Sequence, residues 1–190
     1  MQILARIHYR VLSFQLRLYR EVVLVKSFLL LVHLIFKYPV LQHLVLAQNR
    51  TIVHVSSNAN GTGWCASLIG ITSNGNLGGL VFNNGAVTIS GPLISMSPVW
   101  THVVETWSST NGLRLYQNGV LVSSNSFATA YTASGLSNFI TLGNSLDGMN
   151  VCSGAEAGHQ STGPFDGDID DFRVYSRELT SVDINKIYNS

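Results

Sequence analysis

Short apolar runs separated by Asn-Gly pairs dominate the chain after residue 50. The pairs are Asn60-Gly61, Asn74-Gly75, Asn84-Gly85, Asn111-Gly112 and Asn118-Gly119. Asn and Gly both adopt positive φ, which a type I′ turn requires at its two central residues. Each pair therefore predicts a β-hairpin.

The runs around these pairs are rich in Val, Ile, Thr and aromatic residues, which favour strands. Strands are predicted at residues 101–107, 113–117, 120–124, 139–145 and 168–175. In the second of these, Leu113 and Leu115 share one face, while Arg114 and Tyr116 point to the other. No helix-length periodic segment precedes the end of the chain. The pattern predicts an all-β fold, an antiparallel sandwich of two packed sheets.

One local departure from the strand pattern is informative. Ile169 and Phe172 are both apolar but three residues apart, which indicates a β-bulge or a strand covered on both faces. Asp170 or Asp171 is expected to accept backbone or Arg173 hydrogen bonds.

A short helix is predicted at the end of the chain. Thr180 can cap it, with Asp183 reaching back in a capping box, and Leu179 can pack on Ile184 as a hydrophobic staple. A helix of about two turns is short for independent stability, so it must dock on the sheets.

The first 47 residues differ in character from residues 48–190. They hold six bases and one acid, a net charge of +5, whereas the remainder holds five bases and nine acids, a net charge of −4. Basic residues precede an apolar stretch at residues 27–36, and a cut after Ala47 would leave Gln48 as the new N-terminus. Three interpretations stay open: a signal peptide or signal anchor, a non-native segment joined to the domain in the gene model, or a structural piece that supplies one or two strands.

Composition excludes several classes of protein. Charged residues make up 11% of the 190 and hydrophobic residues 46%, so the chain is not disordered. A net charge of +1 argues against a nucleic-acid partner. Two cysteines are too few for a disulfide-dense scaffold or a four-ligand zinc site.

Three segments carry a family resemblance: WTHVVETWSSTNGLRLYQNGVLVSS, ITLGNS and FDGDIDDFRVYSRELTSVDINKIYN. They resemble the laminin-G-like jellyroll domains of the concanavalin A-like lectin/glucanase superfamily and, more distantly, pentraxins, over residues 51–190. The resemblance implies a two-sheet jellyroll sandwich over residues 48–190, extracellular, which binds carbohydrate or protein, often with calcium near its rim. Such domains open with a strand pattern that residues 1–47 lack. Either the domain is truncated at its N-terminus or this segment replaces those strands, and a sandwich without them would have unpaired edges.

The resemblance places the binding rim in loops, where rigid sandwiches carry their function. The loops concerned hold Trp64, Cys65, Asp147 and Glu156. Trp64 lies in a glycine-rich loop and is the best candidate to stack on a sugar ring, whereas Trp107 ends a strand and is expected in the core.

The acidic run of residues 166–171 invites a catalytic or a metal-binding interpretation. Glucanases of the superfamily use an E-x-D-x-E type pattern, and this run contains no Glu, so no catalytic residue and no enzymatic activity are expected. Carboxylates suit calcium better, and Asp147, Glu156 and Asp166 are the candidate ligands.

Two further features fit a secreted protein. Cys65 and Cys152 are expected to form one disulfide between two rim loops, with a stabilisation of roughly 2–4 kcal/mol. Asn49 and Asn60 begin triplets that match the N-glycosylation acceptor pattern.

The sequence thus predicts a non-catalytic extracellular module that recognises a glycan or glycoprotein, with calcium as an optional aid. The first alternative is a structural adhesion module that contacts proteins and binds no sugar. A glucanase-like hydrolase is the least favoured. The module would be secreted, or membrane-anchored if the N-terminal segment is not cleaved.

Overall fold

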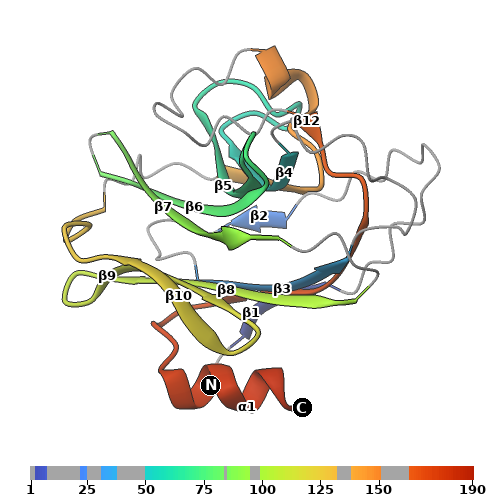
Figure 1. Cartoon of the computed structure of the whole chain (residues 1–190). Helices are drawn as coiled ribbons and strands as arrows, with labels where there is room; N and C mark the ends of the chain where they lie inside the picture. The colour runs from blue at the N-terminus through green and yellow to red at the C-terminus, as the bar shows by residue number, and fades with distance from the viewer. Residues whose placement is uncertain are drawn as a thin grey trace.

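A computed structural model describes residues 3–7, 22–24, 31–37, 50–83, 85–94, 99–131, 138–150 and 163–190. Two β-sheets pack face to face, as predicted, with a short α-helix outside them (Figure 1). Sheet I, the lower sheet in Figure 1, has the order β1-β13-β3-β8-β9-β10. Its strands are β1 (Ile3–Ile7), β13 (Asp168–Tyr175), β3 (Leu31–Lys37), β8 (Thr101–Ser108), β9 (Gly112–Gln117) and β10 (Val120–Asn125).

Sheet II has the order β2-β11-β4-β5-β6-β7. Its strands are β2 (Val22–Leu24), β11 (Asn138–Leu142), β4 (Arg50–Ser56), β5 (Cys65–Ile71), β6 (Asn76–Phe82) and β7 (Ala86–Leu93). The two-residue strand β12 (Gly163–Pro164) pairs with β4 in parallel, and every other pairing is antiparallel. The predicted strands match β8, β9, β10 and β13, but β11 ends at Leu142 rather than residue 145.

The core lies between the sheets and is mostly aliphatic, with a few aromatic side chains. Leu113 and Leu115 of β9 are fully buried in it, as their alternation predicted, and Trp107 joins them. The indole Nε1 of Trp107 donates a hydrogen bond to the Ala128 carbonyl at 2.6 Å, which satisfies its polar atom inside the core.

Strand β3 lies in the middle of sheet I, between β13 and β8. Its Leu34 and Phe36 are fully buried, and the ring of Phe36 meets Phe165 edge-on at 5.5 Å. Strands β1, β2 and β3 of the N-terminal segment therefore occupy positions that would otherwise leave sheet edges unpaired. The boundary at residue 47 and cleavage after Ala47 stay predictions, since Ala47 lies outside the described residues.

Each of the five Asn-Gly pairs lies between two neighbouring antiparallel strands, so the predicted hairpins are confirmed, but only one of the four pairs described in full forms a type I′ turn. Asn118 and Gly119, between β9 and β10, have φ of 51° and 78°, as a type I′ turn requires. In the pairs at 60–61, 74–75 and 111–112 only the glycine has positive φ, so the type I′ prediction is wrong for them. These pairs belong to longer loops, in which the glycine and not the asparagine takes the left-handed position. Residue 84 of the fifth pair lies outside the described part of the chain.

Strand β13 contains the predicted bulge. Its register against β3 shifts between Asp170 and Arg173, and Asp171 adopts φ of 52°. The Asp171 N–H donates to the Asp170 carboxylate at 2.7 Å, and Arg173 Nε donates to Asp171 at 2.8 Å. These two acids therefore stabilise the bulge, as expected from the sequence.

Helix α1 (Ser181–Tyr188) covers the outer face of sheet I (Figure 1). The predicted capping box is present: the Asp183 N–H donates to Thr180 Oγ1 at 3.2 Å, and the Thr180 N–H donates to Asp183 at 3.0 Å. Leu179 and Ile184 are buried against Val104 of β8 and its neighbours. Within the described ranges no helix has the length and apolarity needed to cross a bilayer.

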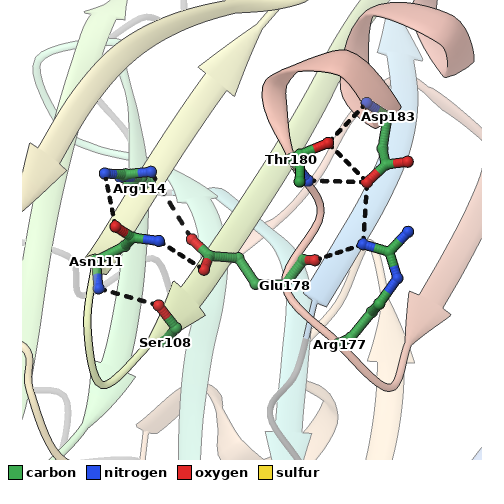
Figure 2. A network of polar contacts seen from close by, with 7 residues as sticks. All are labelled: Ser108, Asn111, Arg114, Arg177, Glu178, Thr180 and Asp183. Atoms are coloured by element: carbon green, nitrogen blue, oxygen red, sulfur yellow. Dashed lines mark hydrogen bonds and ion pairs between the residues drawn. The ribbon is translucent and has the colours of Figure 1, made fainter.

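Polar contacts fix the approach to α1 (Figure 2). Glu178 accepts a hydrogen bond from Asn111 Nδ2 at 2.8 Å and lies 3.9 Å from Arg114 Nη1. Arg177 donates to Asp183 at 3.0 Å, so the β8–β9 turn, the linker and the helix cap form one network.

Candidate binding rim

The loop between β4 and β5, residues 57–64, is a compact structure that closes on itself. The Ser57 N–H donates to the Trp64 carbonyl at 2.8 Å, and the Asn58 N–H donates to the Thr62 carbonyl at 3.2 Å. Gly61 and Gly63 have φ of 86° and 80°. A Cβ on Gly61 would lie 2.3 Å from the Ser145 carbonyl oxygen, so side chains are excluded there by space as well as by φ.

A buried histidine ties this loop to sheet II. His54 of β4 places Nε2 3.0 Å from the Gly61 carbonyl oxygen, which can only accept, so Nε2 carries the proton. Burial lowers the pKa of His54 below its ordinary 6.5, and the bond to Gly61 opposes part of that shift. A neutral imidazole thus holds the loop against the strand.

The short helix η1 (Leu146–Asn150), drawn in orange at the top of Figure 1, brings Asp147 to the same loop. The Asp147 N–H donates to the Asn60 carbonyl at 3.1 Å, and Asn60 Nδ2 donates to the Asp147 carboxylate at 3.3 Å. The structure therefore joins the segments of Trp64 and Asp147, which are more than 80 residues apart in the sequence.

Trp64 is partly exposed, with 37% of its surface accessible. Its ring meets Phe82, at the end of β6, edge-on with a centroid distance of 5.4 Å and an interplanar angle of 83°. Asn60, Trp64, Phe82 and Asp147 are called the binding rim below. Sequence reasoning missed Phe82, although an aromatic residue directly before the Asn-Asn-Gly turn at 83–85 was the available signal.

The described residues give no calcium site at this rim. Asp147 accepts a hydrogen bond from an amide N–H of Asn60, and Asp166 lies half-buried between β12 and β13. In the described ranges, no three His, Cys, Asp or Glu side chains come together in a way that could hold a metal. Glu156 lies outside those ranges, so calcium stays a prediction and enters no step below.

The modification sites are partly covered. Cys65 begins β5 and is buried, and no cysteine in the described part is free. Its expected partner Cys152 and the acceptor Asn49 lie outside the described ranges. Asn60 is exposed, and Thr62 Oγ1 donates to its Oδ1 at 2.7 Å.

Comparison with known proteins places the chain in a superfamily. A family model described as the concanavalin A-like lectin/glucanases superfamily matches residues 44–185. The chain belongs to this superfamily, as the resemblance predicted. None of the curated protein sequences compared with it is similar.

Solved structures share the fold at low sequence identity. The SAP-like pentraxin of Limulus polyphemus is 17% identical with a TM-score of 0.57, and the match covers 87% of this chain and 72% of the pentraxin. The IT-sialidase CBM40 of Ruminococcus gnavus is 16% identical with a TM-score of 0.59, covering 85% and 83%. The binding domain of botulinum neurotoxin DC, solved with SialylT, is 17% identical with a TM-score of 0.55, covering 85% and 35%. These likenesses show the fold alone.

Proposed function

We propose that this protein is a non-catalytic extracellular module that recognises a glycan, or a glycosylated protein, through the binding rim. The observation that carries the proposal is Trp64, a partly exposed indole on a loop fixed by its own hydrogen bonds. An exposed aromatic ring supplies an apolar face for a sugar ring, and adjacent amide and carboxylate groups supply hydrogen bonds that fix its orientation.

The rim combines these two kinds of group. Phe82 packs edge-on against Trp64, which limits the rotamers of the indole and lowers the entropy lost on binding. Asn60 and Asp147 interact with each other, and each retains capacity for further hydrogen bonds to hydroxyl groups. A preorganised aromatic and polar pair suits a hydroxyl-rich ligand.

The similar structures support a glycan ligand in general terms. The neurotoxin binding domain was solved with SialylT, and the CBM40 belongs to a sialidase. Shared fold does not transfer a ligand, because one fold hosts many functions.

The arrangement of acids supports a role without catalysis. Glycoside hydrolysis needs two carboxyl groups on either side of the scissile bond. Asp147 is the one carboxylate among the rim residues, and Asp171 in β13 is bound to Arg173. Absence of turnover on soluble β-glucans, with a folded protein, is the expected result.

An extracellular setting and the Cys65–Cys152 disulfide are part of the same proposal. A buried Cys65 that is not free supports the pairing. Both cysteines should resist alkylation in the folded protein until a reductant is added. Because β3 lies in the middle of sheet I, the first 47 residues are proposed to remain part of the module, whether it is secreted or membrane-anchored.

Glycan-array binding of the full chain, with and without calcium, tests the function. Trp64→Ala should remove binding without changing the melting temperature by more than a few degrees. Trp100→Ala is the matched control, because Trp100 has the same exposed fraction, 37%, and lies outside the rim. Equal binding by both variants would contradict the assignment of the rim.

A second candidate function rests on one edge of sheet I, as the described strands define it. Strand β10 is the last strand of that sheet and exposes Val120 and Leu121, and Phe127 beyond it is 88% exposed. An apolar edge can pair with a partner protein. Leu121→Lys should abolish protein capture on that interpretation and leave glycan binding unchanged.

A further inference from the structure

The basic residues of this chain are absent from the sequence that builds the rim. Residues 51–113 contain no Lys or Arg, and neither do residues 115–172. The β4–β5 loop, the end of β6 and η1 all fall within these two ranges. Any cation near the rim would have to come from elsewhere in the chain.

The basic side chains that the structure describes lie away from the rim. Arg114 pairs with Glu178 and Arg177 with Asp183, beside sheet I and at the start of α1 (Figure 2). Arg173 pairs with Asp171 in β13 of sheet I. Lys186 belongs to the last turn of α1. Arg50 begins β4, at the end opposite the β4–β5 loop, and donates to the Pro164 carbonyl at 2.8 Å.

Backbone N–H groups could replace a cation, because successive free amides form anion-binding nests. In the rim loop most of these amides are used internally. Those of Ser57, Asn58 and Gly61 donate to loop carbonyls, and those of Thr62 and Trp64 donate to the side chains of Asn60 and Ser57.

The amides at the start of η1 are also used internally. The N–H of Leu146 donates to Asn144 Oδ1 at 2.8 Å, that of Asp147 to the Asn60 carbonyl, and that of Gly148 to the Ser145 carbonyl. Asp147 adds a carboxylate, and burial favours the neutral form of His54 beneath the loop. The described rim is therefore neutral to acidic and has few amides to offer an anion.

We infer that the binding rim takes neutral, hydroxyl-rich glycans and rejects glycans that end in sialic acid or sulfate. The inference rests on the proposed function and goes beyond it by naming the ligand class. Carboxylate and sulfate groups are recognised by Arg, Lys or free N–H groups, and a like charge beside Asp147 disfavours them. A fold shared with a domain solved with SialylT therefore does not imply sialyl specificity here.

The test is an array of glycan pairs that differ only in a terminal sialic acid or sulfate, probed with the full chain. Neutral members should bind, and each anionic partner should give a signal lower by about fivefold or more. Binding to the neutral members should change less than about twofold between 0.05 and 0.5 M NaCl, because no ion pair is screened.

Asp147→Asn provides a variant readout. Removal of the carboxylate should raise the ratio of anionic to neutral binding by about threefold, the effect of one like charge at roughly 6 Å in water. The ratio is read on protein with a wild-type melting transition, and the wild-type pairs and salt series test the inference without the variant.

The outcomes separate this inference from the function on which it rests. Stronger binding of anionic members, lost in Trp64→Ala, would overturn the inference and keep the glycan-binding rim. A folded protein that binds no glycan would overturn both.

Discussion

The carboxylate of Glu105 in β8 accepts a hydrogen bond from the backbone N–H of Leu80 in β6, at 3.1 Å, and so joins the two sheets through the core. Both residues are buried. The β5–β6 ladder ends at the pair Ile69–Gly79, so the carboxylate satisfies the amide that follows this pair. Gly79 makes room for it, since a Cβ there would lie 2.4 Å from Glu105 Oε2.

This buried acid makes stability depend on pH. Burial raises the pKa of Glu105 well above its ordinary value of 4.5, and the hydrogen bond from Leu80 opposes part of that rise. The native state then binds a proton more readily than the unfolded chain. The contribution of Glu105 to the free energy of unfolding is therefore fully present below about pH 4.5. It is lost as the pH rises toward the native pKa, by up to about 1.4 kcal/mol per pH unit.

Glu105→Gln should remove that dependence. The amide cannot ionise, and its oxygen can still accept from Leu80. We expect the variant to exceed the wild type in free energy of unfolding above pH 7 by about 1–3 kcal/mol, because a buried charge is no longer formed or neutralised there. Urea unfolding at half-unit steps from pH 4.5 to 8 measures it. Parallel curves for the two proteins would show that Glu105 does not titrate differently on folding.

The fit between Gly79 and Glu105 gives a prediction of its own. Gly79→Ala should destabilise the protein by about 1–3 kcal/mol, because the added methyl group overlaps the carboxylate. In a Glu105→Ala background the same change should cost clearly less, with a coupling energy of about 1 kcal/mol or more. Additive effects in the double-mutant cycle would mean that the methyl group clashes with the strand and not with Glu105.

Most of the fold could be predicted from the alternation of apolar and polar residues along the strands. It separated Leu113 and Leu115 from Tyr116 correctly, and it puts Glu105 on the same face as Val103 and Trp107. An acid at a core position was thus visible in the sequence. Its partner was not, because Leu80 is brought close only by the packing of one sheet on the other.

The rim could be predicted only in part for a similar reason. Trp64 and Asp147 were both predicted at the rim, but Phe82 was not, because it meets Trp64 only through the ordering of strands in sheet II. The turn types failed where loops were longer than two residues, since Asn-Gly fixes a left-handed glycine and not the length of the loop.

Strain at the bulge of β13 can be separated from its ion pair. Asp171→Gly and Asp171→Ala both remove the contacts to Arg173, but only alanine has a Cβ, which is strained at φ of 52°. The Asp171→Ala variant should therefore have a lower free energy of unfolding than the Asp171→Gly variant by about 1 kcal/mol, even though glycine has more conformational freedom in the unfolded chain. Chemical denaturation of both variants measures the difference, and the reverse order would exclude strain at this position.

The link between His54 and the rim loop should make the module sensitive to acid. Burial lowers the pKa of His54, so the unfolded chain binds the proton more readily than the native state does. The contribution of His54 to the free energy of unfolding is therefore present above pH 6.5 and is lost as the pH falls toward the native pKa. His54→Gln keeps an N–H that can donate to Gly61 and does not titrate. The two proteins are best compared in a Glu105→Gln background, because that change removes the opposing titration. Lowering the pH from 7.5 to 5 should then destabilise the protein that keeps His54 by about 1 kcal/mol more than the protein that also carries His54→Gln.

Glycan binding should fall over the same pH range only in the protein that keeps His54. A pH response that is identical in both proteins would place the titrating group elsewhere.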